Sequence, residues 1–331
     1  MDICYASNEA YVPYLAVSLS SCITAHEQEK EALSFHIIAN GISAESRETL
    51  RTFSEAHGHK IWFYDLSDLS SRVPEDLDTG NYDLSMLGRF FMGELLPEDV
   101  RRVLYLDCDT VVEKSLAPLF RDPLPCAEKP ILYGVPEPTI YPSILRQLGL
   151  SDYINSGVLL VNLAAWRSAS AGERLLRFYC KNGGHLYCGD QDAINFVLQG
   201  RIGFLPPEWN FFTNYRYFRY EKLVSLCPGY RAVVPNRRAF LSAKRSPCIL
   251  HYMGAERPWI RGNRNPYRNA FRRAKERSPF GAYPEVCGQE RFMLKYHMMN
   301  LATLCLPPVR DMISRYFEKK EVLPRLRNII K

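Results

Sequence analysis

Short apolar runs alternate with longer segments of helical periodicity over the first 110 residues of the chain. The apolar runs predict β-strands at residues 2–7, 33–40, 60–66 and 103–106. Between them, apolar positions at helical spacing predict helices at residues 14–23, 43–58 and 87–96. Regular alternation of strand and helix is typical of an α/β fold with a mostly parallel sheet.

The same alternation continues to about residue 260 and then gives way to a different pattern. Further strands are predicted at residues 131–135, 156–163, 202–206 and 248–253, and helices at residues 164–183 and 192–200. The composition becomes basic and amphipathic beyond a boundary near residues 279–288. We therefore expect one α/β domain over residues 1–280 and a small basic helical appendage over residues 281–331.

Two acidic residues one position apart follow the fourth predicted strand, in the sequence VLYLDCDTVV (103–112). If the strand continues through this motif, Asp107 and Asp109 share one face and Cys108 points the other way. Two ionised carboxylates so close repel each other unless a cation or a shared proton relieves the repulsion. Ligands of parallel α/β sheets bind beyond the carboxyl ends of the strands, which is where this pair lies. The motif therefore predicts a metal site or acid–base chemistry.

Three classes of protein fit a paired-aspartate motif in this position, and the residues themselves leave all three open. In a Mg²⁺-dependent phosphatase, Asp107 would attack phosphorus and Asp109 would move protons. That site normally opens its fold, whereas about a hundred residues precede it here. In a nucleotide-sugar transferase, the pair would hold a divalent metal that neutralises the departing diphosphate. A non-catalytic protein would bind the sugar nucleotide without turnover.

Three downstream elements add candidate polar groups. His251 ends a predicted strand in ILHYMGAERPW (249–259), where a hydrogen-bonded core histidine is the commoner role and a metal ligand the alternative. Asp190 and Asp192 begin a predicted helix in YCGDQDAINF (187–196), and stabilisation of the helix N-terminus would explain Asp192. Asn155 precedes a glycine-bearing buried strand, a position that a plain turn also explains.

Seven segments, taken in order, make the chain similar to glycosyltransferase family 8 and in particular to its bacterial lipooligosaccharide and lipopolysaccharide galactosyltransferase branch. They are MDICYASNEAYVPYL, LGRFFMGELL, VLYLDCDTVV, INSGVLLVNLAAW, GDQDAINFVL, PPEWNFFTNY and LHYMGAERPW, and they span roughly residues 1–260. The resemblance implies a GT-A-type fold, with a mixed and mostly parallel sheet flanked by helices. It also implies that galactose or glucose moves from a UDP-sugar to a saccharide acceptor with retention of the α configuration.

The resemblance further implies a role for each matching residue. Asp107, Asp109 and His251 would bind Mn²⁺, with Mg²⁺ as the alternative. Ala6, Asn8, Tyr11, Cys108, Gly254 and Arg257 would contact the nucleotide. Arg89, Asn155, Asp190 and Gln191 would surround the donor sugar, and Asp190 and Gln191 are the catalytic candidates. Gln191 lies where the family places the group beneath the anomeric carbon. An amide is a poor nucleophile, so front-face attack by the acceptor is expected rather than a covalent intermediate.

Three positions depart from the family pattern. Asn8 stands where an aspartate commonly meets the uracil, and Ala10 replaces a common asparagine. Arg257 stands where a lysine is usual, which keeps the charge but changes the geometry. None of the three removes an expected metal ligand. The acceptor-facing segment around Glu137 to Tyr141 matches no branch of the family well enough to name an acceptor.

Most of the net charge of +6 lies in the C-terminal appendage, where nine Lys and Arg accompany four Asp and Glu from Gln289 onward. Aromatic residues and methionines are interspersed with these cations, which predicts attachment to an anionic membrane surface. A solvated helix pair that packs by one apolar face explains the same pattern, and both interpretations stay open. No nucleic-acid-binding motif accompanies the charge, so no nucleic-acid partner is expected.

The sequence also indicates where in the cell the protein acts. The chain opens MDICYAS without a basic or signal-like segment, and no apolar run is as long as a membrane span. Its ten cysteines show no CxxC pair and are expected to be reduced. We therefore expect a cytoplasmic enzyme, peripheral on the inner face of the bacterial inner membrane, that acts on a lipid-linked saccharide.

Overall fold

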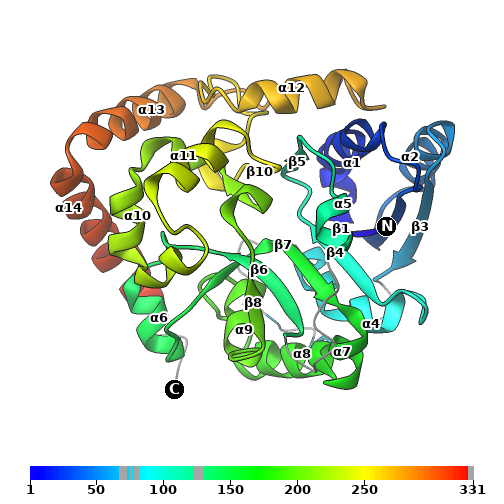
Figure 1. Ribbon diagram of the computed structural model, residues 1–331, viewed down its shortest axis with the longest axis horizontal. Helices are drawn as coiled ribbons and strands as arrows, with labels where there is room; N and C mark the ends of the chain where they lie inside the picture. The colour runs from blue at the N-terminus through cyan, green and yellow to red at the C-terminus, as the bar shows by residue number, and fades with distance from the viewer. Residues whose placement is uncertain (67–72, 75–76, 78–82, 122–129, 327–331) are drawn as a thin grey trace.

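The architecture is built on a seven-stranded sheet with the strand order β3–β2–β1–β4–β7–β6–β8 (Figure 1). The computed structural model describes residues 1–66, 73–74, 77, 83–121 and 130–326. The strands of this sheet are β1 Asp2–Asn8, β2 Ser34–Asn40, β3 Lys60–Asp65, β4 Arg102–Leu106, β6 Leu132–Pro136, β7 Ile154–Asn162 and β8 Ile202–Phe204. Gly80, which the sequence places in a polar loop, lies outside the described residues.

Most neighbouring strands of the sheet are parallel. β1 is parallel to β2 and to β4, β2 is parallel to β3, and β6 is parallel to β8. Only β7 runs antiparallel to its neighbours, β4 and β6. The predicted fold class, a mixed and mostly parallel sheet flanked by helices, is confirmed. Because β1 and β4 are adjacent and parallel, their carboxyl ends open at the same edge of the sheet.

Helices cover both faces of this sheet, and alternate residues of its strands face two separate cores. Tyr5 and Leu104 belong to one core, and Cys4 and Tyr105 belong to the other. The first core is covered by α1 Val12–His26, α2 Ala44–Ala56, α5 Ala117–Arg121, α10 Tyr220–Leu226, α11 Arg237–Arg245 and α12 Arg268–Arg277. The second is covered by η2 Leu84–Phe91, α4 Met92–Leu95, α7 Leu163–Ser168, α8 Ala171–Lys181 and α9 Asp190–Val197.

A small three-stranded sheet joins distant parts of the chain beside the main sheet. Its strands are β5 Thr110–Val112, β10 Ile249–His251 and β9 Phe211–Phe212, in the order β5–β10–β9. β10 runs antiparallel to β5, with His251 opposite Thr110. This pairing places His251 beside the chain that follows Asp109.

Two predicted helices differ in detail from the structure. The helix expected over residues 164–183 is two helices, α7 and α8, separated where Ser170 adopts a φ of 45°. The helix expected over residues 87–96 is a 3₁₀ helix up to Phe91 (η2) and an α-helix from Met92 to Leu95 (α4). A Cβ atom at Gly172 would lie 2.0 Å from the carbonyl oxygen of Phe90, so α8 begins directly against η2. The break between α7 and α8 thus lies two residues before this close contact.

The C-terminal helices lie along one edge of the molecule, orange to red in Figure 1. They are α13 Glu290–Cys305, α14 Pro307–Phe317, the π-helical turn η7 Glu318–Val322 and α15 Leu323–Leu326. His297 on α13 hydrogen-bonds the Tyr217 hydroxyl through Nδ1 and accepts from the backbone N–H of Arg264 through Nε2. Within the described residues, none of the helices combines the length and the apolar character that crossing a bilayer requires. The last described helix, α15, packs against α6 Pro142–Leu148.

Candidate functional site

A cavity of about 1000 Å³ opens where β1 and β4 end. All thirteen residues that the sequence predicts as site residues line it. They are Ala6, Asn8, Tyr11, Arg89, Asp107, Cys108, Asp109, Asn155, Asp190, Gln191, His251, Gly254 and Arg257. The structure therefore brings every candidate to one place, whereas the role of each remains a prediction.

Asp107, Asp109 and His251 form a cluster of oxygen and nitrogen donors at the end of β4. One ligand atom from each lies within 4.8 Å of the other two. Two ligands bound to Mg²⁺ at ~2.1 Å are at most about 4.2 Å apart, so small adjustments suffice to hold an ion. Carboxylate and imidazole ligands suit Mn²⁺ or Mg²⁺. The cluster fits the divalent metal that the sequence predicts.

A turn, and not one face of a strand, brings the side chains of Asp107 and Asp109 together. The prediction that the two side chains share a strand face is therefore wrong. β4 ends at Leu106, and residues 107–109 form the turn that leads into β5. Thr110 closes this turn, since its backbone N–H and its hydroxyl both donate to the carbonyl oxygen of Asp107, at 3.2 and 2.8 Å. Cys108 points away from the cluster, and its thiol donates to the carbonyl oxygen of Ala6 at 3.6 Å.

His251 is oriented by a residue that the sequence analysis did not single out. Its Nδ1 lies 3.0 Å from Oδ1 of Asn210, and its Nε2 lies 3.2 Å from Oδ1 of Asp109. A carbonyl oxygen only accepts, so Nδ1 carries the proton and Nε2 is free to bind a metal. Asn210 lies in PPEWNFFTNY, one of the segments that carry the family resemblance, and this was the available signal.

The charges of the cluster shift two pKa values in opposite directions. Burial disfavours the charged imidazole, but the carboxylates of Asp109, Asp107 and Glu137 together outweigh burial and raise the pKa of His251. Burial also disfavours the Asp109 carboxylate, but His251 and then Arg257 lower its pKa below the ordinary range. Both shifts express how strongly this site favours positive charge beside the aspartates.

The absence of a side chain at Gly157 on β7 leaves room for His251 and Asp107. A Cβ atom at this position would lie 2.3 Å from Cε1 of His251 and 2.7 Å from Oδ2 of Asp107. No side chain fits there while both groups keep their places. The glycine in INSGVLLVNL is therefore required by the site and not by a turn, since Gly157 lies inside the strand.

Arg89 links the cluster to the opposite wall of the cavity. Its Nη2 donates to Oδ1 of Asp107 at 2.9 Å, and its Nη1 donates to the carbonyl oxygen of Ser156 at 2.6 Å. Its Nε lies 3.0 Å from Oδ2 of Asp190 but donates to the carbonyl oxygen of Met86. Arg89 is thus buried, each of its three nitrogen atoms donates a hydrogen bond, and its charge offsets those of Asp107 and Asp190.

Asp190 lines the cavity and has one fully buried carboxylate oxygen. Its Oδ2 accepts no hydrogen bond from the described residues, although the charge of Arg89 lies beside it. Burial raises the pKa of Asp190 to about 6, with Arg89 opposing the shift and Asp107 adding to it. A buried acceptor without a donor is costly, and the adjacent guanidinium offsets part of that cost. Asp190 is therefore a carboxylate on the cavity wall whose charge depends on Arg89.

The Gln191 amide is held by four hydrogen bonds. Its Oε1 accepts from Nδ2 of Asn155 at 2.9 Å and from the backbone N–H of Ser156 at 3.0 Å. Its Nε2 donates to Oε2 of Glu137 at 3.0 Å and to the Tyr153 hydroxyl at 3.2 Å. An amide with every group engaged serves as a fixed surface of the cavity. Glu137 is a second residue that the sequence analysis did not name individually, because its segment matched no branch of the family.

Asn8 and Gly254 also line the cavity, whereas Asp192 does not. Oδ1 of Asn8 accepts from the backbone N–H of Tyr11 at 3.1 Å, which fixes the start of the loop after β1. Gly254 adopts a positive φ of 57°, a conformation that favours glycine. Asp192 does not line the cavity: it accepts from the Tyr153 hydroxyl at 2.6 Å and from the backbone N–H of Cys188 at 2.8 Å. Asp192 therefore binds Tyr153 and the loop before α9, and stabilisation of the helix N-terminus by its charge stays a prediction.

Comparison with known proteins gives a consistent result. The model of the family described as "Glycosyl transferase family 8" matches residues 2–262. General stress protein A of Bacillus subtilis (strain 168) is 24% identical over 277 residues, which cover 82% of this chain and 91% of that protein. Lipopolysaccharide 1,2-glucosyltransferase of Escherichia coli (strain K12) is 26% identical over 284 residues, covering 85% and 79%.

A solved structure shares the fold. It is the crystal structure of the galactosyltransferase LgtC in complex with donor and acceptor sugar analogs. The two structures superpose with a TM-score of 0.68 at 25% sequence identity. The similarity covers 88% of this chain and 100% of that chain.

Proposed function

The chain belongs to glycosyltransferase family 8, and from this premise we propose that it transfers galactose or glucose from a UDP-sugar to a saccharide of lipopolysaccharide type. The observation that carries the proposal is the convergence of the Asp107, Asp109 and His251 donors with Asp190 and Gln191 in one cavity. Two proteins named above supply the substrate class, since one is a lipopolysaccharide glucosyltransferase and the other a galactosyltransferase. Mn²⁺ is the proposed metal, and retention of configuration the proposed outcome.

The phosphatase alternative is less well supported by the cavity. Oδ1 of Asp107 already accepts from Arg89 at 2.9 Å and from the Tyr105 hydroxyl at 3.2 Å, which leaves one oxygen to face a ligand. A phosphatase of this type also needs a lysine beside its nucleophile. The described residues that line the cavity include no lysine.

In the proposed mechanism, the residues of the chain bind and orient both substrates. A bound divalent metal would supply positive charge to the departing diphosphate. Arg257 and the backbone at Gly254 would face the same diphosphate. Asp190 and Asn155 would hold hydroxyl groups of the donor sugar, while Gln191 forms a rigid surface beneath it.

The chemical step exchanges one bond at the anomeric carbon for another. The bond from that carbon to the diphosphate oxygen breaks, and a bond to an acceptor hydroxyl oxygen forms on the same face. The acceptor proton passes to the departing diphosphate. Four hydrogen bonds hold Gln191, so we propose that it positions the sugar and does not attack it.

Release of UDP without an acceptor tests this proposal. We expect slow release from UDP-galactose or UDP-glucose in Mn²⁺, and none in EDTA, because water replaces the acceptor poorly. The preferred donor identifies the sugar. Phosphate release from p-nitrophenyl phosphate, without UDP release or Mn²⁺-dependent UDP binding, would instead support the phosphatase. UDP binding without turnover, even with saccharide acceptors added, would support a binding protein.

We further propose that residues 281–331 are a membrane-associating tail that follows a catalytic domain over residues 1–280. Large apolar side chains are exposed along α13 and α14: Phe292, Leu294, Met298, Met299, Leu301, Leu306, Val309, Met312, Tyr316 and Phe317. Exposed apolar area on this scale is unusual on a soluble surface. A location on the inner face of the bacterial inner membrane, with a lipid-linked acceptor, follows as part of this proposal.

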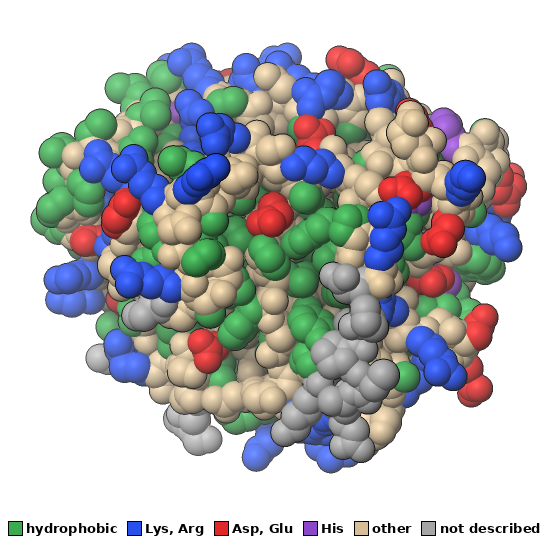
Figure 2. Space-filling model, in the orientation of Figure 1, with side chains coloured by type: hydrophobic (Ala, Val, Ile, Leu, Met, Phe, Trp, Pro, Cys, Tyr) green, Lys and Arg blue, Asp and Glu red, His purple; other side chains and the backbone are tan. Residues whose placement is uncertain are grey.

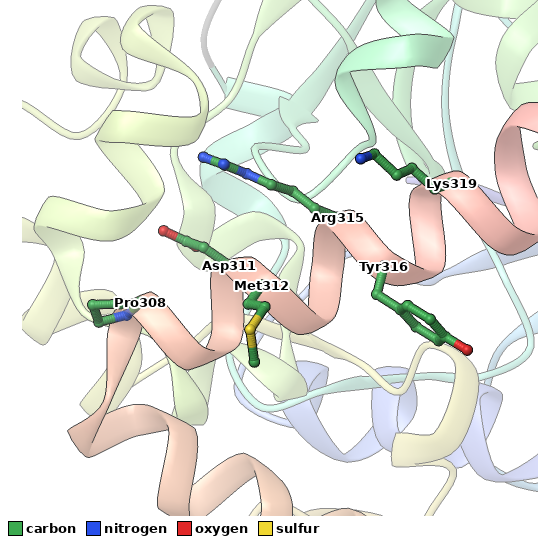
Figure 3. Close-up of a pocket in the computed structure, with 6 residues that line it drawn as sticks. All are labelled: Pro308, Asp311, Met312, Arg315, Tyr316 and Lys319. Atoms are coloured by element: carbon green, nitrogen blue, oxygen red, sulfur yellow. The ribbon is translucent and has the colours of Figure 1, made fainter.

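The arrangement of these side chains suits a lipid surface. Figure 2 shows hydrophobic side chains gathered at the edge occupied by α13 and α14, with Lys and Arg beside them. In Figure 3, Met312 and Tyr316 project from one side of α14, and Asp311 and Arg315 from the other. Apolar groups would enter the interface while basic groups contact anionic headgroups, at about 1 kcal/mol for each cation.

Substitution of this apolar face should weaken vesicle binding. The double variant Met312→Ser and Tyr316→Ser removes two side chains that are 65% and 59% exposed, so the fold should be unaffected. Loss of ~1.5 kcal/mol for each buried side chain predicts at least about a tenfold weaker affinity for vesicles of phosphatidylglycerol and phosphatidylcholine. Co-sedimentation with these vesicles measures the affinity. Leu241→Ser on α11, also exposed, is the control. Unchanged binding of the double variant would contradict the assignment.

A further inference from the structure

The last described turns of the chain are fastened to the catalytic domain at α6. Val322 is fully buried and Leu326 nearly so, in a small apolar core with Ile144, Leu148 and Tyr153. Two hydrogen bonds hold the same segment at its ends. Oε1 of Glu318 accepts from the backbone N–H of Ser143 at 2.9 Å, and Nε2 of Gln147 donates to the carbonyl oxygen of Leu326 at 3.0 Å. The segment Glu318–Leu326 is therefore part of the folded body (Figure 1).

This segment brings one more cation to the cavity, Arg325. Arg325 lines the cavity together with Tyr187 and Cys188 of the loop before α9. The charge of Arg325 acts on the Tyr187 hydroxyl. Burial raises the pKa of this hydroxyl to about 12, Tyr141 adds to the shift, and Arg325 opposes the shift. The rings of Tyr141 and Tyr187 meet edge to face at 6.4 Å. Arg325 thus lies on the cavity wall with Tyr187, whose ring is supported by Tyr141.

The proposed mechanism already assigns roles to the other two arginines of the cavity. Arg89 is buried between Asp107 and Asp190. The charge of Arg257 acts on Tyr11 and Asp109, beside the metal cluster, where the diphosphate would lie. Arg325 has different neighbours from both, so neither the metal cluster nor the diphosphate accounts for it.

Arg325 is exposed, and none of the described residues forms an ion pair with it. No carboxylate of the described residues lies within 4.0 Å of its guanidinium, so it forms no ion pair there. Glu321, one helical turn earlier, also acts on Tyr187 but is not paired with Arg325. An unpaired guanidinium on a substrate cavity is suited to a bidentate contact with phosphate or carboxylate.

We propose that Arg325 binds an anionic group on the saccharide acceptor, a phosphate or a carboxylate, in a subsite that it forms with Tyr187. The tyrosine offers an apolar ring face and a hydroxyl to the sugar, and the guanidinium binds the anion. This inference rests on the proposed function, because it assumes that a saccharide enters the cavity beside the donor. The segment that follows the membrane-facing helix α14 would thereby select among acceptors.

Binding of three monosaccharide probes to protein saturated with UDP and Mn²⁺ tests the proposal. The probes are glucose, glucose 6-phosphate and glucuronate, measured by NMR titration. UDP occupies the diphosphate site, so a charged probe must use another cation. We expect at least one charged probe to bind about tenfold more tightly than glucose, as a charge-assisted contact would give. Preference for glucose 6-phosphate alone identifies phosphate, and preference for glucuronate identifies carboxylate.

Three variants decide whether Arg325 is responsible. Arg325→Gln should remove the tenfold preference, while Arg325→Lys should keep part of it. Arg315→Gln, on the same C-terminal segment but outside the cavity, should leave it unchanged. Equal binding of all three probes by the wild-type protein, or a preference that survives Arg325→Gln, would overturn the proposal. UDP affinity and UDP release, measured on the same samples, report separately on the proposed transferase function.

Discussion

Replacement of Asp109 by asparagine should lower the rate of sugar transfer by at least about a thousandfold. The amide keeps the shape of the side chain but removes the charge that lies 3.2 Å from Nε2 of His251. A metal at a developing diphosphate is worth several kcal/mol, and each 1.4 kcal/mol is a factor of ten in rate. UDP affinity in Asp109→Asn should also lose its dependence on Mn²⁺. Turnover assays and calorimetric titration of UDP, with and without Mn²⁺, measure both effects.

A second acidic residue of the same cavity provides the matched control. Asp83 also lines the cavity, but it accepts from the backbone N–H of Ser85 and from Asn40 and lies outside the metal cluster. Asp83→Asn should therefore keep both the activity and the Mn²⁺ dependence. Near-normal transfer by Asp109→Asn would remove the metal assignment, and an equal loss in both variants would show that any change of charge in the cavity is harmful.

The sequence predicts the location of the site better than the local geometry that builds it. Apolar runs and helical spacing are properties of short segments, so they reveal the sheet and the position of Asp107 and Asp109 at a strand end. The turn through residues 107–109 was missed because an apolar run does not show at which residue the strand ends; hydrogen bonds from Thr110 to Asp107 close the turn. The break at Ser170 was missed because a serine, and not a glycine, adopts the positive φ there.

Residues whose role depends on distant partners were hardest to predict. Asn210 looks like any polar residue of a loop until β9 places it beside Nδ1 of His251. Gly157 looks like a weak point in a strand until the structure places two metal-ligand candidates where its side chain would be. Arg325 is one of many cations in a basic tail, and only the burial of Val322 and Leu326 brings it to the cavity.

Asp190→Asn should lower kcat by about a hundredfold while UDP affinity stays within a factor of two. The variant removes the charge of the carboxylate that we propose as the acceptor for a donor-sugar hydroxyl, and hydrogen bonds to charged groups are worth about 1.5–3 kcal/mol. The nucleotide lies elsewhere in the proposed mechanism, so its affinity should be nearly unchanged. Steady-state kinetics with UDP-galactose or UDP-glucose, together with UDP titration, separate the two effects.

The pKa of Asp190 adds a second readout. Burial raises this pKa to about 6, so the carboxylate is protonated below that pH and ionised above it. A bound metal would offset the charge of Asp107, which contributes to the shift, and so would move the transition to a lower pH. Wild-type kcat should therefore rise with pH up to about 6, and Asp190→Asn should lack this rise.

Asp192→Asn distinguishes loss of sugar binding from damage to the helix. Asp192 lies two residues further along α9 and is engaged by Tyr153 and Cys188, outside the cavity. Its replacement weakens two buried hydrogen bonds and should lower the melting temperature but leave the pH dependence of kcat intact. If Asp192→Asn reproduced the kinetic defect of Asp190→Asn, the start of α9 would have only a structural role, and Asp190 would not be a donor-sugar contact. If kcat fell in Asp190→Asn alone, the buried carboxylate would be a donor-sugar contact.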